Sequence, residues 1–167
     1  MAMPALAKMP SAVPARAKLF ASIVVICLQG VHAMAVEGLI TLRSAHGPKD
    51  TMDRLEATVK AKGLTVFAHV DHAAGAAAVG SPLRPTDLLI FGNARGGTPL
   101  MQSIQTIGVD LPLKILVWQD DADNTWLSYN GPGWLAKRHG AGRDTEATIA
   151  ALSGALQALA RSATGSS

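Results

Sequence analysis

The chain has 167 residues, 49% of them hydrophobic and 16% charged, with a single cysteine and a formal net charge of +3. This length is enough for one domain with a single core. Three of the 15 basic residues, Lys8, Arg16 and Lys18, lie in the first 35 residues, which hold no acid, so the rest of the chain balances 12 acidic residues with 12 basic ones. Without a basic excess the chain lacks the charge that nucleic-acid binding needs, and we expect no nucleic-acid partner.

Residues 1–35 have the pattern of an export signal. Basic residues precede an apolar segment, 19–28, and the sequence A-M-A at 33–35 matches a signal-peptidase cleavage site. We therefore expect cleavage before Val36, a periplasmic or secreted product, and membrane contact only through the signal segment before cleavage. An uncleaved N-terminal anchor is the alternative, although the apolar segment is short for a bilayer span.

The only cysteine, Cys27, lies inside this apolar segment. Its removal with the leader would leave a mature chain without a thiol. Disulfides, cysteine nucleophiles and thiolate metal sites are then excluded together.

The first half of the expected domain alternates strands and helices. We predict a strand over 39–42, a helix from Pro48 to Gly63, a strand over 64–70 and a short helix in the Ala/Gly-rich segment 73–80. In the helix, Met52, Leu55 and Val59 share one face. In the strand over 64–70 the alternation would turn His69 and Asp71 to one side, away from the aliphatic residues.

The central stretch 86–98, T-D-L-L-I-F-G-N-A-R-G-G-T, organises the rest of the chain. Its continuous apolar run, 88–91, favours a strand covered on both faces, and Gly92-Asn93 marks a turn. Thr98-Pro99 is a good helix start, and Leu100, Ile104 and Ile107 would form one stripe of a helix that ends at Gly108. A strand, a glycine-rich turn and a helix N-terminus together are typical of anion-binding sites, but we favour the simpler interpretation that a tight turn needs these small residues. Because Thr98 stands where a phosphate-binding loop has its lysine, we do not expect nucleoside triphosphate binding.

The last part of the chain predicts a hairpin and a final helix. We expect strands over 113–118 and 125–129, an acidic turn over 120–124, a helical turn over 134–139, and a final helix capped by Asp144 or Thr145. The acidic turn lacks the glycine and the distal glutamate of an EF-hand loop, which favours a solvated hairpin turn over a calcium site. The fold class is therefore a two-layer α/β (α+β) sandwich with about five strands and three main helices. It occupies residues 36–161 and is followed by a disordered tail, 162–167.

Four segments occur in a characteristic order. They are V-D-H at 70–72, L-L-I-F-G-N at 88–93 followed by G-T at 97–98, G-V-D-L-P-L-K at 108–114, and Y-N at 129–130 with R-H at 138–139. Together they resemble domain-of-unknown-function family 302 over roughly residues 39–139. The resemblance implies a compact α/β sandwich that tends to form homodimers and has no established activity. The chain departs from the family's pattern at Ala94, where members often have proline, which implies a looser turn.

Polar residues within the resemblance suggest a metal site or a general base. His69, Asp71, His72 and His139 are the candidate ligands for zinc, copper or iron, provided that the strand breaks at Asp71. As catalytic candidates, Asp71 would orient His72, and His72 would move protons near neutral pH. The structural alternative is that the Asp71 carboxylate holds the imidazole or caps the next element.

Asn93, Arg95, Thr98 and Tyr129 are the candidate ligand-binding residues, and each also has an ordinary structural role. We expect an exported binding or accessory domain, homodimeric, with a polar pocket near Asp71, His72, Asn93 and Thr98. The alternatives are a metal-independent hydrolase or isomerase that uses Asp71-His72 as general base, and a purely structural dimer module. The three tryptophans are expected in the core or in a dimer interface.

Overall fold

A computed structural model describes residues 36–166, so the predicted leader and Cys27 lie outside the described residues. The strands are β1 (Leu39–Arg43), β2 (Thr65–Asp71), β3 (Thr86–Gly92), β4 (Leu113–Gln119) and β5 (Thr125–Asn130). The helices are α1 (Pro48–Ala61), α2 (His72–Ala78), α3 (Ala94–Ser103), α4 (Pro132–His139) and α5 (Glu146–Thr164), with 3-10 segments η1 (Gln105–Val109) and η2 (Arg143–Thr145). Every predicted strand is present.

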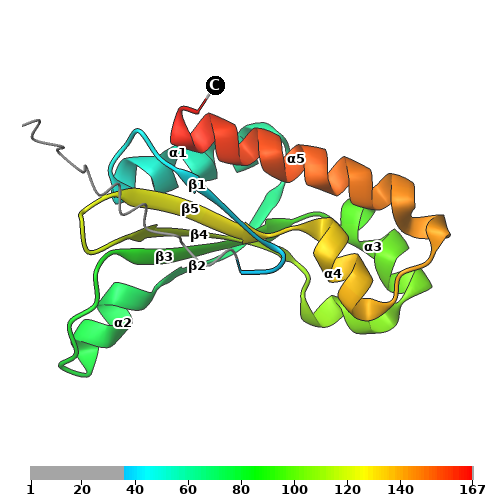
Figure 1. The fold of residues 1–167 in the computed structure, drawn as a ribbon, viewed down its shortest axis with the longest axis horizontal. Helices are drawn as coiled ribbons and strands as arrows, with labels where there is room; N and C mark the ends of the chain where they lie inside the picture. The colour runs from blue at the N-terminus through cyan, green and yellow to red at the C-terminus, as the bar shows by residue number, and fades with distance from the viewer. Residues whose placement is uncertain (1–35, 167) are drawn as a thin grey trace, which may run out of the picture. The chain divides into compact units, whose positions relative to one another are not determined.

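The five strands form one antiparallel sheet in the order β1-β5-β4-β3-β2. Helices α1 and α5 pack against each other and cover one face of this sheet (Figure 1). The predicted two-layer α/β sandwich and its five strands are confirmed. The described part of the chain has five α-helices where three main ones were expected, because the short segments α2 and α4 also form complete helical turns.

The core lies between the sheet and these two helices. It is built from the alternate residues of β3, β4 and β5 that face α1 and α5. The fully buried side chains of this layer are Leu55, Val59, Leu89, Phe91, Ile115, Val117, Leu127, Ala160 and Ala163. Burying one side chain of leucine or phenylalanine size stabilises the fold by about 1.5–3 kcal/mol, so each large side chain of this layer contributes on that scale.

The opposite face of the sheet, here called the open face, carries Leu88, Ile90, Leu116, Trp118 and Trp126. All five side chains are half-buried, whereas Leu89 and Phe91 on the helix-covered face are fully buried. The expectation that β3 would be covered on both faces is therefore correct for one face only. A continuous apolar run occurs in strands that are covered by helices on both faces. It also occurs in strands that are covered on one face and leave the second face partly exposed.

The two tryptophans of the open face are fixed by polar contacts at their edges. Their ring centroids lie 6.2 Å apart with an interplanar angle of 24°. The Trp118 indole N–H donates to Ser128 Oγ at 2.9 Å. A stacked pair held in this way presents flat apolar surface while its polar atoms stay bonded.

A β-bulge in β2 breaks the alternation that the sequence suggested. Val66 pairs with Phe91, but Ala68 pairs with the neighbouring residue Ile90, so the register shifts at Phe67. Ala68 and Val70 therefore lie on the face opposite to Val66, and the predicted common face is wrong for this strand. The extra residue of a bulge reverses the facing of everything that follows it.

Helix α3 begins at Ala94, five residues before the predicted first helical residue, Pro99. Asn93 is its N-cap, and the Asn93 side-chain oxygen accepts the Gly96 N–H at 2.8 Å. This bond satisfies one of the free amides of the first turn, which is why the helix starts at Ala94 in spite of two glycines and the internal Pro99. The predicted stripe is also interrupted, since α3 ends before Ile104 and Ile107 lies in η1.

The C-terminal helix continues through the start of the predicted tail. Ala163 and Thr164 are fully buried, and the Ala45 N–H donates to the Thr164 carbonyl at 2.9 Å. The helix ends only at Gly165, which adopts φ 70°. The expected disordered tail from 162 is thus wrong for these residues, because the last turn packs against the chain just after β1. At the other end of α5, Thr145 occupies the N-cap position without a side-chain cap bond.

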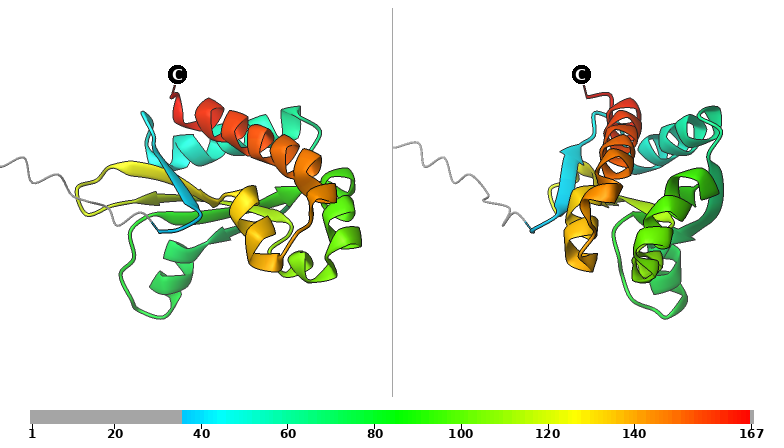
Figure 2. Two further views of the ribbon diagram at one scale, coloured as in Figure 1. Left: turned by 45° about the vertical axis from the view of Figure 1, so that its right-hand side comes forward. Right: turned by 90° about the vertical axis from the view of Figure 1, so that its right-hand side faces the viewer.

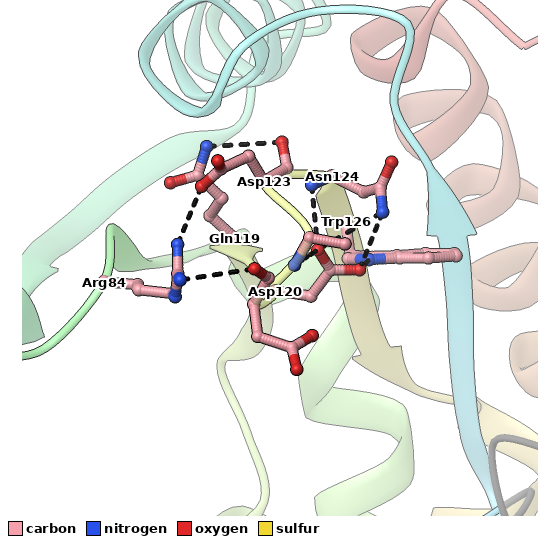
Figure 3. A network of polar contacts seen from close by, with 8 residues as sticks. Arg84, Gln119, Asp120, Asp123, Asn124 and Trp126 are labelled. Carbon is pink, nitrogen blue, oxygen red and sulfur yellow. Dashed lines mark hydrogen bonds and ion pairs between the residues drawn. The ribbon is translucent and has the colours of Figure 1, made fainter. Parts of the chain in front are cut away.

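A polar network closes the β4–β5 hairpin (Figure 3). The Asp120 carboxylate accepts the Trp126 indole N–H at 2.7 Å and the Asn124 backbone N–H at 2.8 Å. Arg84 reaches the same turn and pairs with Asp123 at 2.7 Å. The bond from Trp126, supported by those from Asn124, lowers the pKa of Asp120 below its ordinary value.

The low pKa of Asp120 predicts a pH-dependent contribution to stability. The ordinary pKa of an aspartate is about 3.9, and a folded-state pKa below it gives stabilisation that is complete above about pH 5 and lost as the pH falls through the folded pKa. We expect Asp120→Asn to lower the melting temperature near neutral pH and the difference from wild type to shrink in acid. Thermal unfolding between about pH 3 and pH 7 measures this difference.

Asp121→Asn is the matched control, because the Asp121 side chain is exposed and has no bond within residues 36–166. It should melt like wild type at every pH. An Asp120→Asn difference that stays constant over the whole pH range would contradict the assignment.

Candidate functional site

The four residues expected around one polar pocket lie at two ends of the sheet. In the antiparallel pair β2–β3, Thr65 is opposite Gly92 and Asp71 is opposite Asp87. A strand rises about 3.3 Å per residue, so Asp71 and the turn after Gly92 are separated by roughly 20 Å. The predicted shared pocket of Asp71, His72, Asn93 and Thr98 is therefore wrong, and the two halves of the prediction must be considered separately.

At the first end, Asp71 has the structural role that the sequence left open. It is the N-cap of α2, and its Oδ1 accepts the Ala74 N–H at 2.7 Å. His72 is the exposed first residue of that helix, and no hydrogen bond joins its ring to another described side chain. His69 Nε2 instead lies 3.2 Å from Asp87 Oδ1. The Asp71 carboxylate thus accepts a backbone N–H and, in the part of the chain that the structure describes, makes no hydrogen bond with the His72 imidazole.

The four metal candidates are dispersed. Within residues 36–166 there is no group of three His, Cys, Asp or Glu side chains placed to hold one metal ion. His69 and His72 lie near the end of β2, whereas His139 ends α4 and bonds to Asp110.

His139 belongs to a second polar cluster that sequence analysis did not assemble. Its Nε2 lies 2.7 Å from Asp110 Oδ2, its Nδ1 lies 3.2 Å from Thr106 Oγ1, and its side chain is only 10% exposed. Arg138 approaches the same carboxylate at 3.6 Å and lies over the Trp134 ring. This hydroxyl–imidazole–carboxylate chain can hold one imidazole tautomer, and it ties α4 to η1. Its signal was the presence of Asp110 and His139 in two separate family segments.

The other end of the sheet holds a cavity of about 570 Å³, here called the α3–α5 cavity. Its lining comes from the ends of β2, β3 and β4, from α3 and α5, and from the loop before β4. Helix α3 lies beside the start of α5 at this end of the sheet (Figure 2). The lining residues are Leu64, Phe67, Phe91, Gly92, Asn93, Ala94, Arg95, Gly96, Gly97, Met101, Leu111, Pro112, Leu113, Ala151, Leu152, Ala155 and Leu159.

Small residues create this space. Helix α5 lines it with Ala151 and Ala155, whose methyl groups leave room next to Leu152. On the facing helix, a Cβ at Gly96 would lie 3.4 Å from Leu152 Cδ2 and one at Gly97 would lie 3.6 Å from Leu111 Cδ1. Both distances are ordinary van der Waals contacts, so the two leucines pack directly against this turn of α3 and form part of the cavity walls.

The candidate ligand residues divide between the cavity and its surroundings. Asn93 and Arg95 line the cavity, whereas Thr98 is exposed on the next turn of α3 and is absent from the lining. Tyr129 is in the core beside a smaller hollow of about 300 Å³, and burial raises the pKa of its phenol. Sequence reasoning found the polar edge of the cavity but missed its apolar walls, because those come from α5 and from the loop before β4.

Residues 36–166 form an α/β sandwich domain with an antiparallel sheet and an apolar pocket beside its helix layer. The chain belongs to the family called domain of unknown function DUF302, whose family model matches residues 40–159. The crystal structure of an uncharacterised conserved DUF302 protein from Bacillus stearothermophilus has the same fold. Its TM-score is 0.69 at 19% sequence identity, over 77% of this chain and 99% of that chain.

Curated relatives come from Brucella species. The chain is 46% identical over 115 residues to a protein named Fluoride-specific ion channel FluC 1 in Brucella suis, a match that covers 69% of this chain and 45% of that protein. A protein of the same name in Brucella abortus is also 46% identical, with 43% of its length covered. The chain thus spans less than half the length of these relatives. Within residues 36–166 every helix is too short or too polar to traverse a membrane.

The contacts of Asp71 and His72 predict different effects of their removal. We expect Asp71→Ala to destabilise the domain by about 0.5–2 kcal/mol, because the Ala74 amide loses its cap. His72→Ala should change the free energy of unfolding by less than about 0.5 kcal/mol, because its exposed ring has no described partner. Urea unfolding of both variants measures these values. Equal losses in the two variants would show that the residues act as a pair.

Proposed function

We propose that this is an exported accessory domain that binds a small, largely apolar molecule in the α3–α5 cavity. The observation that carries the proposal is the cavity itself. Its volume of about 570 Å³ lies within the range of small-molecule sites, and nearly all of its lining is apolar.

The expected affinity follows from the apolar surface. A ligand that buries on the order of 200 Å² of apolar surface gains about 5 kcal/mol from the hydrophobic effect, before the cost of losing its freedom of motion. Because 5 kcal/mol alone corresponds to a dissociation constant of roughly 0.2 mM, binding should lie in the submillimolar to millimolar range, unless polar contacts add to it. Such an affinity suits a carrier or sensor that exchanges its ligand.

Export is proposed from the leader pattern of residues 1–35, and the accessory role from the relatives. In the Brucella proteins named as fluoride channels, a region similar to this chain accounts for less than half of the length. We propose that this region is an accessory domain there, and that the present chain has a related role beside a membrane protein.

The competing functions have less support. The hydrolase or isomerase hypothesis needs Asp71 to orient His72, but the Asp71 carboxylate caps α2. A zinc or copper site would need ligands that lie in separate parts of the domain. Neither activity is part of the proposal.

Filling the cavity should prevent binding. In Ala155→Leu the larger side chain would occupy the space beside Leu152, and we expect the affinity for the neutral fluorophore diphenylhexatriene to fall at least about tenfold, since overpacking costs about 1–3 kcal/mol. Fluorescence titration of the full chain measures the affinity, and thermal unfolding confirms that the variant is folded.

Ala158→Leu is the control for this variant, because Ala158 is exposed on the same helix and does not line the cavity. It should bind the fluorophore like wild type. Wild-type affinity in Ala155→Leu would place the binding elsewhere and sink the proposal.

We further propose that two copies associate through the open face. Leu88, Ile90 and the stacked Trp118 and Trp126 form a contiguous apolar surface, and Val70, 36% exposed, extends it onto β2. Apolar surfaces of this kind are typical of interfaces, and two-fold symmetry lets one patch serve both copies. Burial of this apolar surface would then explain the homodimer that the family resemblance implies.

A charge on the open face should separate the copies. We expect Val70→Glu to convert a wild-type dimer into a monomer, because the carboxylate would be buried without a partner in the interface. Sedimentation velocity measures the mass. Val109→Glu, at a residue that is 74% exposed in η1, should remain dimeric. A monomeric wild type, or a dimeric Val70→Glu, would refute this interface.

A further inference from the structure

We infer that the ligand of the α3–α5 cavity is an anionic amphiphile, an alkyl carboxylate whose chain fills the cavity and whose head group pairs with Arg95. This inference rests on the proposed function, because it names the class of molecule that the same cavity would take.

The charge of the lining carries the argument. Arg95 is the only charged side chain among the lining residues, and the lining contains no aspartate or glutamate. Arg95 is exposed, so its guanidinium reaches solvent while its residue borders the apolar space. The cavity therefore has one cationic residue, next to the polar Asn93, on a largely apolar wall.

Arg95 is also free to bind a ligand. Within residues 36–166 the arginine ion pairs are those of Arg84 and Arg138, and Arg95 has none. A guanidinium matches the two oxygens of a carboxylate with two parallel hydrogen bonds. An anionic head group would thus meet an unpaired partner without displacing a contact of the protein.

The backbone around Arg95 favours the same sign of charge. Arg95 lies in the first turn of α3, where the helix dipole is positive. The Asn93 side chain already accepts the Gly96 amide, and the Asn93 carbonyl accepts the Gly97 amide. The helix dipole adds to the positive field of Arg95, whereas these two amides already have partners within the protein. The cavity and the arginine therefore define the site.

Other occupants fit less well. A cationic amphiphile would place its charge against Arg95 and lose affinity by repulsion. A neutral chain would fill the same apolar space and gain nothing from the arginine. For the same alkyl chain, the affinity is therefore expected to be highest for an anionic head group, lower for a neutral one and lowest for a cationic one.

The test compares three probes with the same alkyl chain on the full-length protein: decanoate, decanol and decyltrimethylammonium, each displacing diphenylhexatriene. We expect decanoate to bind about fivefold to tenfold more tightly than decanol, as for a hydrogen-bonded ion pair near the surface, and the cation to bind most weakly. Added salt should weaken decanoate, leave decanol unchanged and bring the cation closer to decanol, because the attraction and the repulsion at Arg95 are both screened.

Arg95→Gln should reduce the decanoate affinity to that of decanol and leave decanol unchanged, whereas Arg95→Lys should retain part of the preference. Arg143→Gln is the matched control, since Arg143 is exposed and outside the lining. It should behave like wild type.

The outcomes separate the two proposals. Equal binding of decanoate and decanol by wild type, or decanoate binding unaltered in Arg95→Gln, overturns the anionic head group while the apolar cavity stands. Failure of the fluorophore and of all three probes to bind refutes the cavity as a ligand site, and this inference with it.

Discussion

The packing of α1 and α5 onto one face of the sheet is the constraint on which the rest of the domain depends. Leu89 and Phe91 of β3 are fully buried under these helices, and Leu88 and Ile90 of the same strand face the other way. Because strand alternation is strict over this stretch, placing one set in the core fixes the open face on the opposite side. The same packing brings α5 alongside α3, so the cavity is a by-product of how the core is closed.

Local patterns were sufficient for the elements but not for their facing or their distant contacts. The strand over 113–118 and the helix from Pro48 were predictable, because their periodicity and end residues are local signals. The bulge at Phe67 was not, since a register shift depends on the partner strand rather than on the bulged one. The start of α3 was missed because Asn93 was assigned to a turn and Thr98 to the cap, whereas the Asn93 side chain accepts the Gly96 N–H and caps the helix.

The candidate site was half predictable for the same reason. Asn93 and Arg95 were found because they lie in the glycine-rich turn. Whether that turn lies near Asp71 and His72 depends on how the strands pair, which the sequence does not show. Antiparallel pairing of β2 and β3 sends the two polar segments to opposite ends. The walls come from Ala151 and Ala155, more than fifty residues later, and nothing in an alanine-rich helix indicates that its small side chains border a cavity.

Helix α5 serves two structures at once, and this links ligand and fold. Leu159 is part of the core and also lines the cavity, so the helix cannot leave one without opening the other. A molecule that binds only when α5 is packed on the sheet stabilises that packed state. The stabilisation grows with the logarithm of the ratio of ligand concentration to dissociation constant. A ligand in the cavity would therefore oppose local opening of α5, and hydrogen exchange in this helix would slow as the cavity fills.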